Sequence, residues 1–370
     1  MKKKLAVVAV ISAALLGLSA CSSDSPAASM DMSTGSSMDA ATVTALGGEE
    51  SVAYLDDLYK QAVAAGQNTI NVYGVTATSS ASLYTAFSAR YPEITVNHVT
   101  VFGAELQSRI ASEQATKQYI ADNVSVSGAD AIYVSSKGYL ADQSIPLASS
   151  LAAVNKPAGE QLYGGNEYLY TLAYNSDQVA DADAPTSFAD LLDPKYKGKI
   201  GMYDPMVGNT GFVSAAIAAG KIDETWLTKF RANDPVIFPS ERDLFTAVST
   251  GQVSMGLGDY IRGDAFLKTD SLPVKFVAKW KDGVSSGTFY RGTVKDAPNA
   301  LASNLLVAWW LTPEAQELIA EQGQPGLMPD APAVPGQPAL SEITVNPEPT
   351  FAEYGTFTDS MNALFKKAFS

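Results

Sequence analysis

The sequence predicts an α/β protein with two lobes. Patterns typical of strands alternate with patterns typical of helices, which indicates right-handed βαβ units and parallel sheets. The chain has 370 residues, and the roughly 300 that remain after an expected leader and tether exceed what one hydrophobic core usually organises. The same alternation starts again in the middle of the chain, so we expect a second α/β lobe.

The elements of the first lobe follow from the spacing of apolar and β-branched residues. Apolar side chains recur at helical spacing from Val52 to Val63, and Pro92 helps to end the helix that contains Leu83 and Phe87. In chain order we expect a helix at 52–63, a strand at 69–73, a helix at 83–91, a strand at 94–101, a helix at 106–113 and a strand at 129–134.

The second half of the chain repeats this style. Strands are expected at 168–174, 199–203, 236–238 and 254–257, separated by helices. Thr312 is an N-cap candidate, Pro313 suits the first helical position and Glu314 the first turn, so a helix is predicted to begin there. A last amphipathic helix is expected at 361–369.

The N-terminus predicts export and a lipid anchor. Lys2 to Lys4 form a positive region, and the apolar run Leu5 to Leu16 is too short for a membrane span, which is typical of a secretory signal. The run ends in Leu18 to Cys21, which resembles the bacterial lipobox, and Cys21 is the only cysteine. We expect residues 1–20 to be a lipoprotein signal peptide and 21–48 a flexible tether, with the chain held at a membrane by its lipid.

The charge of the chain limits its partners. The formal net charge is −14, and nucleic acid or an anionic membrane surface would require clustered Lys and Arg. The acidity therefore argues against nucleic acid and is read as solubility outside the cell. It does not identify a cationic ligand.

Three phrases carry a family resemblance. Residues 185–200, which include Ala189-Asp190-Leu191-Leu192-Asp193-Pro194, resemble the signature of the bacterial extracellular solute-binding family that includes ferric-ion, polyamine, thiamine and phosphonate binders. Residues 173–176 and 311–316 are similar to two further family phrases, and similar phrases run from about Thr69 to Gly326. The resemblance covers most of the mature chain.

The resemblance implies the type II periplasmic-binding fold, in which two lobes joined by crossing strands enclose a ligand, and it implies service to an ABC importer. No cofactor is expected. The expected partners are a small solute, a membrane ABC permease and the lipid anchor, with the chain a monomer at the outer face of the cytoplasmic membrane, or in the periplasm of a diderm cell. The expected parts are lobe 1 at 49–168 and 285–325, lobe 2 at 169–284 and 350–370, and an extended proline-rich segment at 326–349.

The candidate ligand residues follow predicted strand ends, where loops enter helix N-termini and backbone N–H groups point outward. In the first lobe they are Thr76, Ser79, Ser80, Gly103, Ser135 and Ser136, and in the second lobe Asn209, Thr210, Arg242, Asp259 and Tyr260. Ordinary helix capping is the competing interpretation, since Ser, Thr and Asn are common caps.

Hydroxyl-rich helix starts favour a small organic anion as the ligand, with Arg242 or Arg262 as a bidentate charge partner, although surface arginines are the competing interpretation. Ferric ion is the alternative. Ferric binders of the family usually present two adjacent tyrosines, and here Asp259 is followed by the single Tyr260. His98 is the only histidine and lies inside a predicted strand, which favours a packed or edge histidine over a ligand.

A hydrolase using Ser285 is the remote alternative, because Gly283 to Gly287 matches G-x-S-x-G. That motif requires a strand before the serine, a helix after it and a later histidine. Here Thr288 to Tyr290 is predicted as a strand, and the only histidine comes earlier. The sequence therefore predicts a binding protein that is not an enzyme.

Overall fold

The computed structural model describes residues 39–75, 80–204, 211–259, 272–335, 337–346 and 349–369. The first described element is helix α1 (Ala40–Ala45), where the Asp39 carboxylate caps the helix by accepting from the Thr42 amide. Leu46 is buried in the first hydrophobic core. A flexible tether was expected at residues 21–48. For residues 39–48 that prediction is wrong, because the capped helix and the buried Leu46 order them.

The ten described strands join one sheet in the order β2-β1-β3-β9-β4-β7-β5-β6, with β10 beside β9 and β8 beside β4. Their bounds are β1 Thr69–Gly74, β2 Thr95–Thr100, β3 Asn123–Val126, β4 Tyr163–Asn175, β5 Ile200–Tyr203, β6 Val236–Phe238, β7 Met255–Asp259, β8 Val274–Phe276, β9 Val284–Thr293 and β10 Val345–Asn346. The sheet contains two parallel groups, β2-β1-β3 and β7-β5-β6.

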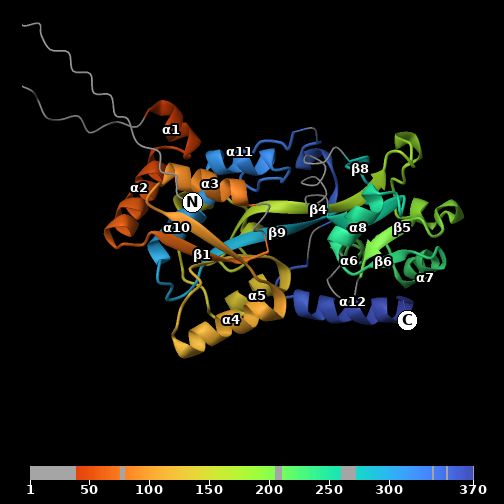
Figure 1. Ribbon diagram of the computed structural model, residues 1–370, viewed down its shortest axis with the longest axis horizontal. Coiled ribbons are helices and arrows are strands. Elements are labelled where there is room, and N and C mark those ends of the chain that lie inside the picture. Colours follow the sequence, from red (N-terminus) through yellow and green to blue (C-terminus); the bar gives the residue numbers. More distant parts are fainter. Residues whose placement is uncertain are drawn as a thin grey trace, which may run out of the picture. The chain divides into compact units, whose positions relative to one another are not determined.

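The two long strands β4 and β9 join these groups. They pair antiparallel with each other, while β9 also pairs antiparallel with β3 and β4 with β7. Figure 1 shows both strands running from one parallel group to the other. We call β4 and β9 the crossing strands, and their presence between two parallel groups confirms the predicted two-lobe α/β architecture.

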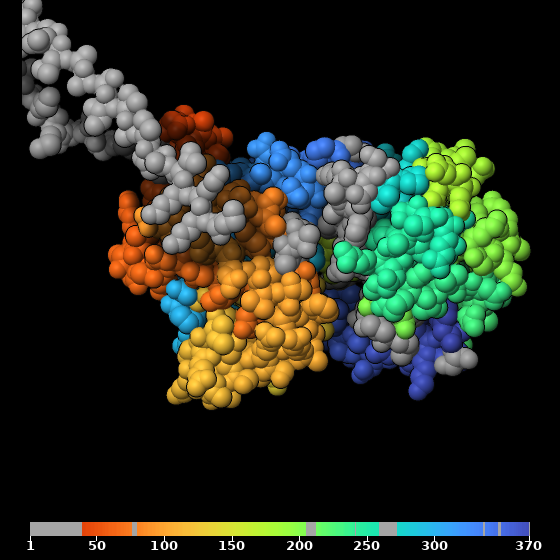
Figure 2. Space-filling model, in the orientation of Figure 1, coloured from red at the N-terminus to blue at the C-terminus, as the bar shows by residue number. Residues whose placement is uncertain are grey.

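Helices cover the sheet in both lobes. Besides α1, the α-helices are α2 Glu49–Ala64, α3 Ala81–Arg90, α4 Gly103–Thr116, α5 Gly128–Ser136, α6 Gly211–Ala218, α7 Glu224–Ala232, α8 Glu241–Ser249, α10 Ala300–Trp310, α11 Pro313–Glu321 and α12 Tyr354–Phe369. In Figure 2, helices α2 to α5 of the first lobe (red to yellow) and α8 of the second (green) form separate regions of the surface. Each lobe has its own core, one with Phe87 and Trp309 and the other with Phe188 and Leu227.

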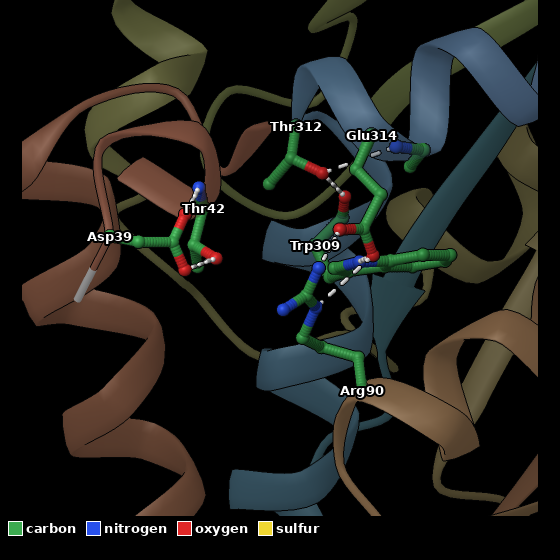
Figure 3. A network of polar contacts seen from close by, with 7 residues as sticks. Asp39, Thr42, Arg90, Trp309, Thr312 and Glu314 are labelled. Atoms are coloured by element: carbon green, nitrogen blue, oxygen red, sulfur yellow. Dashed lines mark hydrogen bonds and ion pairs between the residues drawn. The ribbon is translucent and has the colours of Figure 1, made fainter. Parts of the chain in front are cut away.

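Most predicted elements are confirmed, including α11 at Thr312 and Pro313. The Thr312 hydroxyl accepts from the Ala315 amide at 3.3 Å. Figure 3 shows the Glu314 carboxylate between Arg90 and Trp309, with Arg90 Nε 3.3 Å and the Trp309 indole nitrogen 3.1 Å from Glu314 Oε1. This network ties α3 to the helix pair α10 and α11, so it fixes the helical cover of the first lobe.

The strand predicted at 129–134 is wrong. The third strand is β3, fully buried between β1 and β9. Gly128 then turns the chain with a φ of 49° and begins α5, in which Ala131 and Val134 are buried at helical spacing. A short apolar run fits a buried helix as well as a buried strand, and periodicity alone does not separate them.

Candidate functional site

Several predicted site residues lie outside the described residues. They are Thr76, Ser79, Asn209, Thr210 and Tyr260, together with Cys21, the lipid-anchor candidate, and Arg262. Asp259 is the last residue of β7, and its backbone pairs with Tyr170 of β4. The described residues therefore report mainly on the first-lobe side of the predicted site.

Ser80 lies directly before α3 and contacts Arg291, a residue that the sequence patterns did not indicate. Arg291 belongs to β9 and is 2% exposed, and Ser80 is 4% exposed. The Arg291 guanidinium donates to the Tyr84 hydroxyl at 3.1 Å and to the Ser80 hydroxyl at 3.4 Å. A crossing-strand arginine and a loop that follows β1 therefore meet at a polar cluster.

Arg291 is a buried cation with no acidic partner in the described ranges. Among the described residues no carboxylate forms an ion pair with it, and its Nε–H has no acceptor. Its guanidinium carbon lies 3.4 Å from the Trp310 ring centroid, so stacking offsets part of the desolvation cost. Burial lowers the pKa of Arg291, and the contact with the Tyr84 hydroxyl opposes that effect. A buried cation with an unused donor is suited to receive an anion.

The hydrogen bonds leaving Arg291 have a definite direction. His98 Nε2 lies 3.1 Å from the Gly74 carbonyl, which can only accept, so Nε2 carries the proton and Nδ1 accepts from the Tyr84 hydroxyl at 3.1 Å. Tyr84 in turn accepts from Arg291. Burial lowers the pKa of His98, which favours its neutral form. Both ring nitrogens are engaged, as the prediction of a packed histidine requires.

Aromatic residues of the crossing strands extend this cluster toward the second lobe. Tyr168 of β4 lies 4.7 Å, between ring centroids, from Phe289 of β9. Val75, directly after β1, and Tyr170 pack against this pair. Phe289 and Arg291 are two residues apart in β9 and share a face of the strand. Aromatic packing therefore continues from the buried cation along the crossing strands.

The other described candidates occupy different positions. The Gly103 amide, at the start of α4, donates to the Asp130 carboxylate of α5 at 2.7 Å, so the loops after β2 and β3 are adjacent. Ser135 and Ser136 lie in the last turn of α5 and donate to backbone carbonyls three residues earlier. They do not follow a strand, because the residues before them are helical.

Arg242 lies in the first turn of α8, exposed, in a helix that Ser240 caps by accepting from the Asp243 amide. The residues that follow β3 are instead Ser127 and Gly128, the cap and first residue of α5. The sequence does contain the strand before this loop, at Asn123–Val126. The loop was missed because the strand was predicted at 129–134 instead.

The serine of the G-x-S-x-G motif lies within a strand. Ser285 belongs to β9, is fully buried and donates to the Phe212 carbonyl at 3.1 Å. A strand continues through Thr293, so the strand–turn–helix context of a nucleophile elbow is missing at this position. The neighbouring Ser286 forms a hydrogen bond with Glu167 of β4. Burial raises the pKa of Glu167 to about 7, and the hydrogen bond with Ser286 opposes that shift.

A model of the family described as bacterial extracellular solute-binding protein matches residues 82–348. The chain belongs to this family. The match covers both crossing strands and parts of both lobes, and it includes Arg291.

Relatives agree with this assignment. A probable ABC transporter periplasmic-binding protein of Sinorhizobium fredii is 27% identical over 244 residues, which span 62% of this chain and 66% of that protein, just under two thirds. Iron-bound HitA of Pseudomonas aeruginosa has a TM-score of 0.69 at 22% identity, covering 81% of this chain and 99% of that chain. The substrate-binding protein of an Agrobacterium tumefaciens ABC transporter has a TM-score of 0.69 at 16% identity, covering 81% and 96%. These structures show that the fold is the two-lobe periplasmic-binding type.

Within the described ranges, no helix is long and apolar enough to cross a bilayer. In the same part of the chain, no three His, Cys, Asp or Glu side chains are grouped so that they could hold a metal ion. Tyr260, which was named with Asp259 for ferric ion, lies outside the described residues.

Proposed function

We propose that the protein captures a small organic anion outside the cytoplasm and delivers it to the membrane permease of an ABC importer. The family, the two-lobe fold and the name of the curated relative support the transport role. In this fold the ligand is enclosed between the lobes, and closure around it marks the protein as loaded for the permease. The protein binds its solute and does no chemistry on it.

The observation that supports an anion is Arg291. A guanidinium that is 2% exposed, has no acid partner in the described ranges and keeps an unused Nε–H is costly unless something compensates its charge. A carboxylate or phosphonate of the solute supplies that compensation and matches the planar fork of arginine. Ser80 and the N-terminus of α3 add a hydroxyl and backbone donors on the same side.

The remaining contacts stay predictions. Thr76 and Ser79 precede Ser80 in the chain and are proposed to complete the first-lobe side. Asn209, Thr210, Asp259 and Tyr260 are proposed for the second lobe, opposite them. The apolar pair Tyr168 and Phe289 would then contact the carbon skeleton of the solute.

We propose a lipid anchor at Cys21, which places the monomeric protein at the outer face of the cytoplasmic membrane, or in the periplasm of a diderm cell. The lipobox-like Leu18 to Cys21 and the cationic, apolar leader support this location. A diacylated N-terminus provides stable anchoring without a spanning helix.

Ferric ion is the second candidate. It is favoured by the similarity to iron-bound HitA. It would use Asp259 and Tyr260 with a synergistic anion, for which Arg291 is also a suitable partner.

A thermal-shift panel separates these readings. Organic acids, phosphonates, polyamines and ferric ion are tested one at a time against the purified mature chain. A true ligand at about 100 times its dissociation constant adds roughly 2.7 kcal/mol to the free energy of unfolding. An organic acid or phosphonate is expected to raise the melting temperature. A response only to polyamines, or only to ferric ion with a visible charge-transfer band, contradicts the organic anion.

A further inference from the structure

A pocket of about 320 Å³ lies beside the crossing strands, away from the Arg291 cluster. Its floor includes Leu169 and Thr171 of β4 and Val284 of β9. Successive side chains of a strand point to opposite faces, so Tyr168 and Tyr170, which alternate with these residues, face the other side of β4. The pocket is therefore separate from the proposed solute site.

The roof of the pocket is the proline-rich segment 325–343. Its start is held by Gln316, which is 1% exposed and accepts from the amides of Leu327 and Met328 at 3.1 and 3.3 Å. Its far end leads into β10, where the Asn346 side chain donates to the Gly283 carbonyl at 2.9 Å. Both ends are fixed by buried or partly buried hydrogen bonds, so the roof is a built part of the fold.

The walls of the pocket are uncharged and mostly apolar, with Thr171, Gln337 and Ser341 as their polar side chains. None of its described lining residues is Asp, Glu, Lys, Arg or His. Four prolines line it, Pro325, Pro329, Pro332 and Pro338, and these provide apolar rings but no N–H donors. The Thr171 hydroxyl is already used, since it donates to the Val277 carbonyl at 2.6 Å. Such walls reject a charged solute, because its desolvation would not be offset.

We propose that this pocket is a second binding site, for a small neutral aromatic molecule of one or two rings. Its volume is at the lower end of the range for small-molecule sites, which fits such a ligand. The roof connects α11 of the first lobe with β10, which pairs with β9 at its second-lobe end. A bound ring therefore lies against the crossing strands and stiffens them where lobe motion must bend them.

The test uses indole as the probe and methyl NMR of the mature chain labelled at methionine. Met328 lines the pocket, whereas Met202 is buried in the second-lobe core and provides an internal control. Met328→Leu assigns the signal. A saturable shift of the Met328 methyl is expected, with Met202 unchanged. Amide exchange at Leu169 to Thr171 should slow in the presence of indole.

Two filling variants give the matched comparison. Val334→Phe and Ala331→Phe place a ring in the pocket and should weaken indole binding at least tenfold, and the less buried Ala331 guards against misfolding of the first. Ala152→Phe adds the same ring at an exposed site and should change nothing. Arg291→Met should bind indole with wild-type affinity, so the indole test does not depend on the proposed solute site. A non-saturable shift, wild-type affinity for indole in both filled variants, or unchanged amide exchange overturns the proposal.

Discussion

The guanidinium carbon of Arg291 lies 3.4 Å from the ring centroid of Trp310, and no described carboxylate pairs with that cation. Trp310 itself is 2% exposed and donates to the Asn166 side chain of β4 at 3.3 Å. The tryptophan is thus fixed to one crossing strand while it supports the arginine of the other. This arrangement holds a buried cation in place with no counter-ion among the residues that the structure describes.

Arg291→Met is expected to leave the free energy of unfolding of the ligand-free protein unchanged or to raise it. Replacing a buried charge by an apolar side chain of similar length is often neutral or stabilising when the charge lacks a carboxylate partner. Urea unfolding of the two proteins measures the difference. A loss of 3 kcal/mol or more, about the cost of breaking a buried ion pair, would show that Arg291 is a structural cation.

Tyr84→Phe is expected to destabilise the protein by about 1–3 kcal/mol. The change removes the acceptor for Arg291 and the donor for His98, and leaves both partly unsatisfied in a buried position. Tyr119→Phe is the matched control, because the Tyr119 hydroxyl makes an exposed contact with Asp296 at 3.3 Å. This substitution should leave the free energy of unfolding almost unchanged, because the Tyr119 hydroxyl stays solvated. Equal losses of unfolding free energy in the two variants would contradict the buried chain of hydrogen bonds from Arg291 through Tyr84 to His98.

Glu167 predicts a pH dependence of stability. Burial raises its pKa from 4.5 to about 7, so between these values the folded protein binds more protons than the unfolded chain. Its contribution is fully present below pH 4.5 and is lost as pH rises through 7. Because part of the side chain is exposed, a loss of about 1–2 kcal/mol is expected.

Urea unfolding at pH 5 and pH 8 measures this loss, and Glu167→Gln should make the difference between the two pH values smaller. The exposed Glu50→Gln is the control and should retain the wild-type difference. If Glu167→Gln keeps the wild-type difference between pH 5 and pH 8, a raised pKa of Glu167 is not the cause of that difference.

Cys21→Ser is expected to abolish lipid attachment. A serine hydroxyl does not replace the thiol that receives the diacylglycerol, so the variant should stay unprocessed or be released in soluble form. Mass spectrometry of the native N-terminus checks this. An unmodified mature end downstream of Cys21 in the wild type would rule out the anchor.

Local patterns in the sequence were enough for the two lobes and for the cap of α11, because the Thr312–Pro313–Glu314 order and the strand runs act within a few residues. The prediction of a strand at 129–134 failed because Ala131 and Val134 are buried, and a short run of buried apolar residues has the same pattern in a helix as in a strand. The end of the tether failed because Leu46 is ordered by a distant core.

Arg291 was missed for the same physical reason. Its partners Tyr84 and Ser80 lie 207 and 211 residues away in the chain, so no local pattern announces them. The only signal was a single charge within the apolar and hydroxylated run Thr288 to Val294. Ser80 was named because it follows a strand end, where loops of this fold meet ligands, and its role in binding stays a prediction.

Calorimetric titration of the best organic anion from the panel into wild type, Arg291→Met and Arg90→Met tests the central claim most directly. Arg90 pairs with Glu314 on the outer side of the first lobe, so it controls for loss of an arginine elsewhere. The account predicts that Arg291→Met weakens binding by about ten- to a hundredfold, the value of one or two charge-assisted hydrogen bonds, while Arg90→Met binds as wild type does. Wild-type affinity in Arg291→Met would contradict it.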